Sequence, residues 1–393
     1  MPPRDAAVAR DAADPLAAFR AKFIPSASPA IYSDGNSLGP PPFSVRARLN
    51  AMVTEWANDL TGAWERWVDL PLQVGDRLGA ACLGAGAGQV AVCDSTSVNL
   101  FKAVNAAIDG CDASRHEIVV AIDEFPTDRY MLQSIAAQRE MTYVVVGSAA
   151  EAVDACGPST AVMVLSAVNY RTGELFDVAA VTARVHAAGA EIVWDVCHAV
   201  GVVPLELDAW DVRLAVGCTY KYLNAGPGAP AFVYVARAHQ DRLSQPLWGW
   251  FGQRDQFEMG PHYEPAEGVR AWLAGTPNII GTALVDEAAA MIEKAGVTAI
   301  RAKSQHLVAY AIELADELLV SRGWSVITPR EPQRRGGHLA LARSDAQEVC
   351  ATLIDQALVI PDFRAPDVLR LGFSPLVTRF VDVYDAIGAV ASV

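Results

Sequence analysis

The stretch EIVWDVCHAVG (residues 191–201) decides the fold class. Its first part, residues 191–196, is an apolar run rich in β-branched side chains, without the alternation of a half-exposed strand. Such a run predicts a strand that is buried on both faces, as in a parallel sheet with helices on each side. Asp195 and His198 stand at the end of this strand, where ligands bind in sheets of that kind.

The same pattern repeats from about residue 95 to residue 235. Further apolar runs predict strands at residues 117–122, 142–146, 161–166, 214–218 and 231–235. Amphipathic segments between these runs predict helices at residues 97–108, 127–139 and 177–189. The alternation of buried strands and helices indicates an α/β fold with a mostly parallel central sheet and helices on both faces.

The 393 residues exceed what a single core usually organises, so we expect more than one domain. We expect a large α/β domain at residues 61–280, followed by a linking helix region at residues 281–321 that is broken near Gly296. Residues 322–393 alternate between strand-like and helix-like segments and predict a small α+β domain. Residues 1–60 predict a mostly helical arm that forms part of that small domain.

The composition limits the classes of partner. With 31 Lys and Arg against 45 Asp and Glu, the net charge is −14, which argues against binding to nucleic acid or to an anionic membrane. We find no apolar run long enough to span a membrane and no secretory signal at the N-terminus. The seven cysteines form no CxxC pair, so we expect thiols in a cytoplasmic protein and no metal site.

A single lysine, Lys221, lies in the stretch GCTYKYLNAGPG (residues 217–228), directly after a predicted strand. One interpretation is a lysine that extends from a buried strand to solvent. The other is a Schiff-base lysine that holds a carbonyl cofactor inside a cleft. The stretch alone leaves both interpretations open.

Three further polar groups also have two interpretations each. Asp195 suits a protonated pyridine nitrogen, or it forms a structural pair with His198. Ser95, Thr96 and Ser97 open a predicted helix, which makes either a phosphate site or an ordinary N-cap. Arg370 lies on an apolar strand, where it binds a substrate carboxylate or forms a structural salt bridge. An aspartate for a pyridinium and a lysine for an aldehyde are the groups that pyridoxal phosphate requires.

Taken together, these motifs resemble those of the kynureninases, pyridoxal-phosphate-dependent enzymes of fold type I in the aspartate aminotransferase superfamily. The resemblance covers nearly the whole chain. It rests on the motifs YSDGNSLGPPP (32–42), DSTSVNLFKA (94–103), DEFPTDRY (123–130), NYRTGELFD (169–177), WDVCHAVGVVPLELDAW (194–210), GCTYKYLNAGPG (217–228), GWFG (249–252) and RLGFSPL (370–376).

The resemblance implies a site for pyridoxal 5′-phosphate. Lys221 would form the Schiff base, Asp195 would pair with the pyridine nitrogen, and Phe125 would stack on the ring. The other residues of this chain that would line the cofactor are Thr96, Ser97, Pro126, Thr127, Asp128, Ser166, His198 and Tyr220.

The resemblance also implies a homodimer with shared active sites. Trp250 and Thr276, in the Pro-, Gly- and Trp-rich loop at residues 245–280, would complete the phosphate site of the neighbouring subunit. Some relatives have Asn at the position of Thr276.

The implied substrate contacts are Arg370 for the α-carboxylate and Asn36, Ser37 and Trp64 near the aryl end. Trp64 stands where some relatives have histidine. A bulky apolar wall there should favour unhydroxylated kynurenine over the 3-hydroxy form.

The implied activity is hydrolytic cleavage of the Cβ–Cγ bond of L-kynurenine in tryptophan degradation, with 3-hydroxykynurenine as the other candidate substrate. The products are anthranilate and L-alanine. Lys221 would act on the Cα proton, and Tyr220 would return a proton to Cβ.

Three alternatives remain at this point: a pyridoxal-phosphate-dependent aminotransferase, a cysteine desulfurase-like lyase, and an inactive scaffold with the same fold. A desulfurase needs a thiol on a mobile loop late in the chain, whereas Cys350 lies in a predicted helix. A scaffold has no reason to keep Lys221, Asp195 and Arg370 together.

Overall fold

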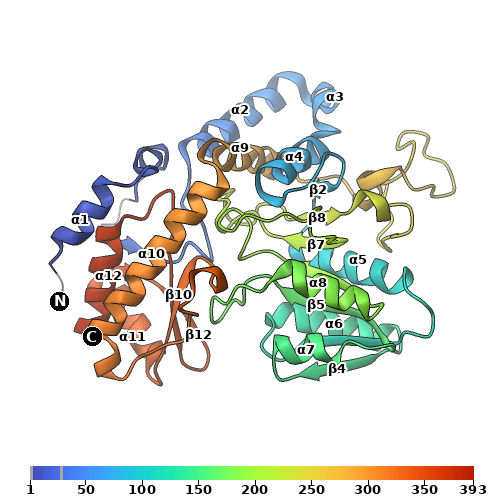
Figure 1. The fold of residues 1–393 in the computed structure, drawn as a ribbon. Coiled ribbons are helices and arrows are strands. Elements are labelled where there is room, and N and C mark those ends of the chain that lie inside the picture. The colour runs from blue at the N-terminus through green and yellow to red at the C-terminus, as the bar shows by residue number, and fades with distance from the viewer. Residues whose placement is uncertain (1–2, 27–29) are drawn as a thin grey trace.

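A computed structural model describes residues 3–26 and 30–393. Its large domain is built on a seven-stranded sheet with the strand order β2–β8–β7–β6–β5–β3–β4 (Figure 1). The strands are β2 (Val90–Val92), β3 (Glu117–Ala121), β4 (Thr142–Val146), β5 (Thr160–Ser166), β6 (Glu191–Asp195), β7 (Leu214–Gly217) and β8 (Phe232–Val235). The five strands from β7 to β4 run parallel, and β8 is antiparallel to both of its neighbours. The predicted mostly parallel sheet is therefore confirmed.

Helices cover both faces of this sheet, as the uninterrupted apolar strands predicted. Along β3, Ile118 and Val120 belong to one apolar cluster, which includes side chains of α5 and α6. Val119 and Ala121 belong to the cluster on the opposite face. The helices that follow the strands are α5 (Thr96–Asp109), α6 (Pro126–Gln138), α7 (Ala149–Ala155) and α8 (Val178–Ala187). The short elements β2 and α7 were not predicted.

The C-terminal part forms the predicted small α+β domain. Its antiparallel sheet has the order β12–β13–β10–β9. Its elements are β9 (Ser325–Val326), β10 (His338–Ala342), α11 (Ala346–Thr352), β12 (Asp362–Arg364), β13 (Val368–Gly372) and α12 (Phe380–Ser392). A separate apolar cluster joins these strands to α12 and to the preceding long helix.

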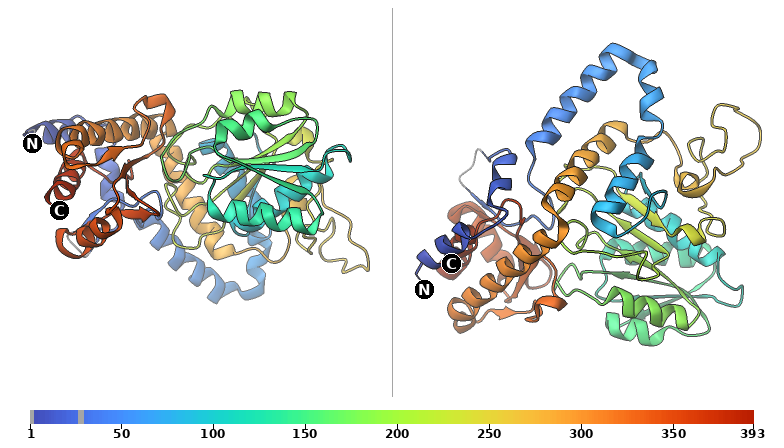
Figure 2. Two further views of the ribbon diagram at one scale, coloured as in Figure 1. Left: turned by 90° about the horizontal axis from the view of Figure 1, so that it is seen from below. Right: turned by 45° about the horizontal axis from the view of Figure 1, so that its top comes forward.

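Two long helices, α9 (Ile279–Ala295) and α10 (Val297–Leu318), connect the domains. They are separated at Gly296, whose φ of 77° suits glycine, and this confirms the predicted break. Figure 2 shows α10 running along the small domain, while α9 packs against α4 (Leu70–Leu78) of the large domain.

The N-terminal arm contacts both domains. Helix α1 (Asp5–Ala12) packs against α12, and β1 (Ile31–Tyr32) pairs with β11 (Val359–Ile360). Helix α2 (Phe43–Asp59) then leaves the small domain and packs against α9 (Figures 1 and 2). The arm therefore contacts the small domain as far as Ser37, and its last helix belongs with the large domain.

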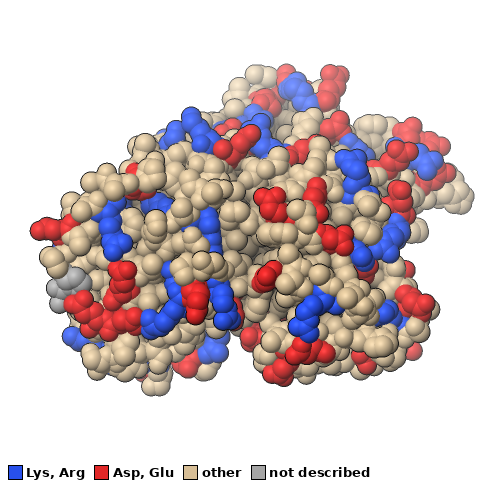
Figure 3. All heavy atoms as spheres, in the orientation of Figure 1, with Lys and Arg blue, Asp and Glu red and all other residues tan. Residues whose placement is uncertain are grey.

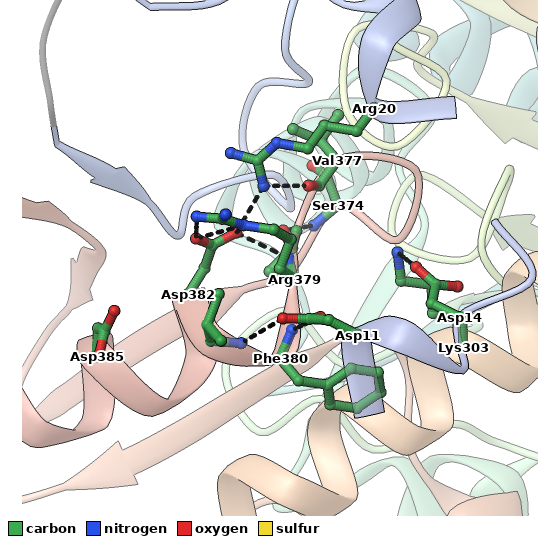
Figure 4. Close-up of polar contacts among 12 residues, drawn as sticks. Asp11, Asp14, Arg20, Lys303, Ser374, Val377, Arg379, Phe380, Asp382 and Asp385 are labelled. Carbon is green, nitrogen blue, oxygen red and sulfur yellow. Dashed lines mark hydrogen bonds and ion pairs between the residues drawn. The ribbon is translucent and has the colours of Figure 1, made fainter. Parts of the chain in front are cut away.

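Polar contacts hold the first part of the arm against α10 and α12 (Figure 4). Asp11 accepts hydrogen bonds from the backbone N–H groups of Phe380, at 2.7 Å, and Val381, at 3.2 Å, and so caps α12 from outside the helix. Asp14 forms an ion pair with Lys303 of α10, with 2.6 Å between the carboxylate and the ammonium nitrogen. Both of these side chains are only 5% exposed. Since burial lowers the pKa of Lys303, and Asp14 opposes that shift, the carboxylate keeps this ammonium charged.

Replacing Asp14 by Asn should destabilise the small domain by about 3–5 kcal/mol, because it leaves a buried ammonium without its counterion. The measurement is urea-induced unfolding at pH 7. Glu313→Gln is the matched control, since it breaks the exposed ion pair between Arg10 of α1 and Glu313 of α10. This control should cost less than about 1 kcal/mol. Equal losses for the two variants would show that the buried pair contributes nothing beyond an exposed one.

Candidate active site

The carboxyl ends of the parallel strands bring the predicted residues to one edge of the sheet. Ser166, the last residue of β5, is in register with Asp195, the last residue of β6. Asp195 in turn is in register with Val216 of β7, from which the chain continues to Lys221. The Lys221 amine lies 3.3 Å from each ring nitrogen of His198. Residues from the ends of three strands therefore lie at one edge of the sheet.

The histidine beside this lysine is neutral. His198 is buried, and its burial, followed by the charge of Lys221, holds its pKa well below the ordinary value. Asp195 accepts a hydrogen bond from the backbone N–H of Cys197 at 2.6 Å. Among the described residues, no hydrogen bond joins Asp195 to His198, so the alternative of a structural Asp–His pair is not what the structure shows.

The segment after β3 covers the lysine. The ring of Phe125 has its centroid 5.9 Å from the Lys221 nitrogen and packs edge-to-face on Tyr170, with centroids 5.3 Å apart. Pro126 and Thr127 begin α6. The ring of Phe125 therefore lies beside the lysine amine.

Three buried carboxyl groups surround this segment. They belong to Glu124, Asp128 and Asp195, which are all buried. Burial, followed by the charges of Asp195 and Glu124, holds the pKa of Asp128 well above its ordinary value. Oδ2 of Asp128 has no hydrogen-bond partner within the described part of the chain. The site therefore contains a buried polar atom that a ligand could pair.

A helix N-terminus points at the same edge. Ser95 caps α5 by accepting a hydrogen bond from the N–H of Val98 at 3.3 Å. The hydroxyl of Thr96 lies 3.7 Å from the sulfur of Cys197, which places this helix start beside the end of β6. The N–H groups of the first turn have no partner within the helix, so Thr96 and Ser97 stand where an anion would be bound.

Arg370 is fully buried on β13 and is already paired. Its guanidinium forms a two-point ion pair with Asp362, with 2.6 Å between Nε and Oδ1, and it also donates to the carbonyl oxygen of Tyr170. The hydroxyl of Ser37 lies 3.3 Å from Arg370 and donates to Asp362 at 2.9 Å. Burial opposes ionisation of Asp362, but the hydrogen bonds from Arg370 hold its pKa below the ordinary value. Of the two interpretations of Arg370, the structural salt bridge is present, with Asp362 as the partner.

Asn36 lies at the same place. It is fully buried against Gly372, and neither polar atom of its amide has a partner within the residues described. Asn36 and Ser37 are thus neighbours of Arg370 and not of Trp64.

His338 is a second neutral histidine that the sequence did not reveal. It is fully buried on β10, opposite Gly372, and its ring centroid lies 6.0 Å from that of His198. Burial, followed by the charge of Arg370, lowers its pKa to about 3. Its place in the site depends on how the small domain packs on the large one, which no local motif encodes.

Tyr220 precedes the lysine and is partly buried, and its burial raises the pKa of its hydroxyl. Its carbonyl oxygen accepts a hydrogen bond from the N–H of Gly39 at 2.8 Å, which connects the arm to the segment that carries the lysine.

Glu124 is another residue of the site that the sequence analysis missed, although it stands inside the motif DEFPTDRY directly after a predicted strand.

The structure does not bring Trp64, Thr276 or Trp250 to the lysine. Trp64 and Thr276 line a separate pocket of about 640 Å³, together with Met52, Trp56, Leu60, Thr61, Trp67, Pro277, Asn278, Ile279 and Ile280. Trp250 packs edge-to-face on Phe251 in the irregular loop that precedes α9. Within a single chain these three residues are therefore outside the site.

The donor set at the sheet edge fits pyridoxal phosphate. Lys221 offers an amine to the aldehyde, Asp195 a carboxylate to the ring nitrogen, and the start of α5 its N–H groups to the phosphate. Among the described residues, no group of three or more His, Cys, Asp or Glu side chains could hold a metal ion.

Solved structures of known proteins share the fold. A mutant of C-DES with glycine covalently linked to its pyridoxal phosphate cofactor superposes with a TM-score of 0.81, at 17% identity, over 95% of this chain and 98% of that one. The cysteine desulfurase CsdA from Escherichia coli gives 0.80, at 17% identity, over 95% and 97%. An alanine–glyoxylate aminotransferase from Nostoc sp. gives 0.69, at 17% identity, over 94% and 97%. The fold is that of the pyridoxal-phosphate-dependent enzymes of fold type I.

Relatives in sequence show which family of this fold type the chain resembles. The chain is 40% identical to a kynureninase from Pseudomonas fluorescens, over 98% of this chain and 94% of that one. It is also 40% identical to a kynureninase from Burkholderia pseudomallei, with the same coverage. The family model described as the kynureninase C-terminal domain matches residues 300–390. The chain belongs to the kynureninase family.

The desulfurase alternative finds no support in the site. Cys350 lies buried within α11 and not on a loop. Burial raises the pKa of its thiol to about 11, which makes it a poor nucleophile.

Proposed function

We propose that this chain is a pyridoxal-phosphate-dependent hydrolase that cleaves the Cβ–Cγ bond of L-kynurenine to anthranilate and L-alanine. The observation that carries the proposal is the amine of Lys221, held 3.3 Å from a neutral histidine at the edge of the sheet, one strand from Asp195. Membership of the kynureninase family selects this reaction among those that the fold supports.

The cofactor would be held by residues on all sides of this edge. Lys221 would attach it, Asp195 would keep its ring nitrogen protonated, and Phe125 would cover its ring. Thr96 and Ser97 would bind the phosphate from the start of α5. The remaining contacts would come from Pro126, Thr127, Asp128, Ser166, His198 and Tyr220. Bound in this way, pyridoxal phosphate withdraws electrons from the substrate carbon that carries the amine.

The protein groups would then move the protons of the reaction. Lys221, freed by the substrate amine, would take the proton from Cα and would return a proton there before alanine leaves. Tyr220 gives a proton to Cβ when the bond to the aryl ketone breaks, since its raised pKa keeps the phenol protonated at neutral pH. Water would add to the ketone carbonyl before this bond breaks, so that the aryl fragment leaves with the carboxylate of anthranilate.

Arg370 would bind the substrate carboxylate in place of Asp362. The guanidinium already makes a two-point contact with a carboxylate, which is the geometry that the substrate would copy. Asn36 and Ser37, as neighbours of Arg370, would hold the substrate from the same side.

We further propose that two chains associate and complete each other's sites. Trp56 and Leu60 are 56% and 63% exposed at the rim of the apolar pocket that contains Trp64 and Thr276. Trp250 is also partly exposed, on a loop that projects from the large domain (Figure 2). A second copy would cover this surface, and Trp250 and Thr276 would reach the phosphate of its cofactor.

We also propose a cytoplasmic protein without nucleic-acid or membrane partners. Figure 3 shows basic and acidic side chains intermixed on one face, with no continuous basic area. All seven cysteines, which lie within the described residues, are free thiols. No helix in the part of the chain that the structure describes is both long and apolar enough to cross a bilayer.

The protein loaded with pyridoxal phosphate should convert L-kynurenine into equal amounts of anthranilate and L-alanine. Anthranilate fluorescence and amino-acid analysis measure the two products. Lys221→Ala should lower the rate more than about a thousand-fold, because it removes both the attachment point and the base. A bound cofactor without anthranilate release would overturn the assigned substrate, and formation of a keto acid would indicate an aminotransferase.

In the proposed dimer Trp64 would face the substrate of the partner subunit and should make the enzyme prefer kynurenine over its 3-hydroxy form, because an apolar wall offers the hydroxyl no hydrogen bond. The expected kcat/KM ratio is about ten-fold or more. Trp64→His should reduce this ratio, whereas Trp56→His, in the same pocket, should leave it unchanged. Comparable kcat/KM values for both substrates in the wild type would contradict the proposal.

Shared sites should be revealed by complementation. A hybrid of Lys221→Ala and Trp250→Ala chains contains one site with both residues intact, so a 1:1 mixture should recover about a quarter of wild-type activity. A mixture of Lys221→Ala and Tyr220→Phe is the matched control and should recover none, because both residues belong to the same chain's site. No recovery in the first mixture, despite hybrid formation, would mean that each chain builds its site alone.

A further inference from the structure

Glu124 makes contacts that the proposed mechanism does not use. It lies between the end of β3 and the start of α6 and is only 3% exposed. One carboxylate oxygen accepts hydrogen bonds from the backbone N–H of Phe125, at 2.7 Å, and from the hydroxyl of Ser166. The other oxygen accepts from the backbone N–H of Ser166 at 2.6 Å. Glu124 thus joins the segment that covers the lysine to the end of β5.

These contacts require a carboxylate. Two backbone N–H groups meet two different oxygens, and neither group can act as an acceptor. A glutamine has one oxygen only, so it loses one of the two bonds in either orientation of its amide. Since the hydroxyl proton of Ser166 is donated to Glu124, the Ser166 oxygen is left to accept a hydrogen bond from elsewhere.

We propose that Glu124 is a positioning residue of the cofactor site, which holds Phe125 over the lysine and fixes the hydroxyl of Ser166 by tying both to one ionised carboxylate. The inference rests on the proposed binding of pyridoxal phosphate at Lys221. In this proposal Glu124 contacts neither the cofactor nor the substrate. It acts through Phe125 and Ser166, which would contact the cofactor.

The surroundings of Glu124 make its hydrogen bonds to Phe125 and Ser166 sensitive to pH. Burial is the main effect that raises the pKa of Glu124 to about 7, opposed by the hydrogen bonds from Ser166 and Phe125. The titratable groups that face it are Asp195, from β6, and Asp128, from α6. Above about pH 7 the ionised carboxylate accepts all three hydrogen bonds. As the pH falls through that value, protonation of Glu124 weakens these hydrogen bonds. The segment that carries Phe125 is then held less firmly over Lys221.

The experiment compares the affinity of the cofactor-free protein for pyridoxal phosphate among variants, by quenching of tryptophan fluorescence between pH 6 and 8. Glu124→Gln should raise the dissociation constant about ten-fold or more at pH 8, as expected for a lost charge-assisted hydrogen bond. It should also remove the part of the wild-type pH dependence that centres near pH 7.

Asp123→Asn is the matched control, because Asp123 is the preceding carboxylate, is only half-buried, and contacts Asn169 at 3.3 Å instead of the segment over the lysine. Its dissociation constant should stay within about two-fold of the wild type. Ser166→Ala, which keeps both backbone bonds to Glu124, should weaken binding less than Glu124→Gln does, and adding it to Glu124→Gln should have less than the additive effect.

Thermal unfolding with and without cofactor separates positioning from stability. The proposal predicts that the rise in Tm on cofactor binding shrinks in Glu124→Gln. If the cofactor-free Tm falls but the dissociation constant and its pH profile match the wild type, Glu124 is merely structural and the proposal is wrong. Should Glu124→Gln fail to fold, Ser166→Ala carries the test, and an unchanged dissociation constant for it would overturn the proposal. A wild-type protein that does not bind pyridoxal phosphate would instead refute the proposed function.

Discussion

The site depends on the placement of charged and polar side chains at the edge of an otherwise apolar sheet. Such groups are stable there only if other polar groups meet them, because burial without a partner costs several kcal/mol. Parallel strands satisfy this condition, since all of their carboxyl ends open onto one edge. Ser166 and Asp195 are brought into register by β5 and β6, and Lys221 follows from β7. The polar partners of these side chains come from the turns and the helix N-termini that follow the strands at the same edge of the sheet.

Much of this arrangement could be predicted from local sequence. Uninterrupted apolar runs marked the buried strands, and the structure places each central strand within one or two residues of its prediction. The break at Gly296 could be predicted because a glycine interrupted a long helical pattern. Residues at the ends of such strands, such as Asp195 and Ser166, were singled out for the same reason. The short β2 and α7 were missed, since three to seven residues carry too little periodicity.

The contacts between domains could not be predicted in this way. His338 lies on a strand of the small domain, and its place in the site follows only from the packing of that sheet beside His198. Asp362 and Arg370 face each other on neighbouring strands of the same small sheet, and the pairing of those strands was not predicted either. Arg370 shows what local reasoning leaves open. Its burial could be inferred from an apolar strand, but whether its partner was a ligand or another residue could not. The structure supplies Asp362, an acceptor with the same shape as the expected ligand.

Within the described residues, the chain passes between the domains at Gly296 and again in the arm between β1 and α2. Connections at two places restrict the orientation of the small domain more than a single linker would. The second crossing contains Asn36, Ser37 and Gly39, and it is bonded to the Tyr220 carbonyl on one side and to Asp362 on the other. Any change in that orientation would therefore also move side chains beside Lys221, so that the orientation of the domains and the shape of the site are coupled.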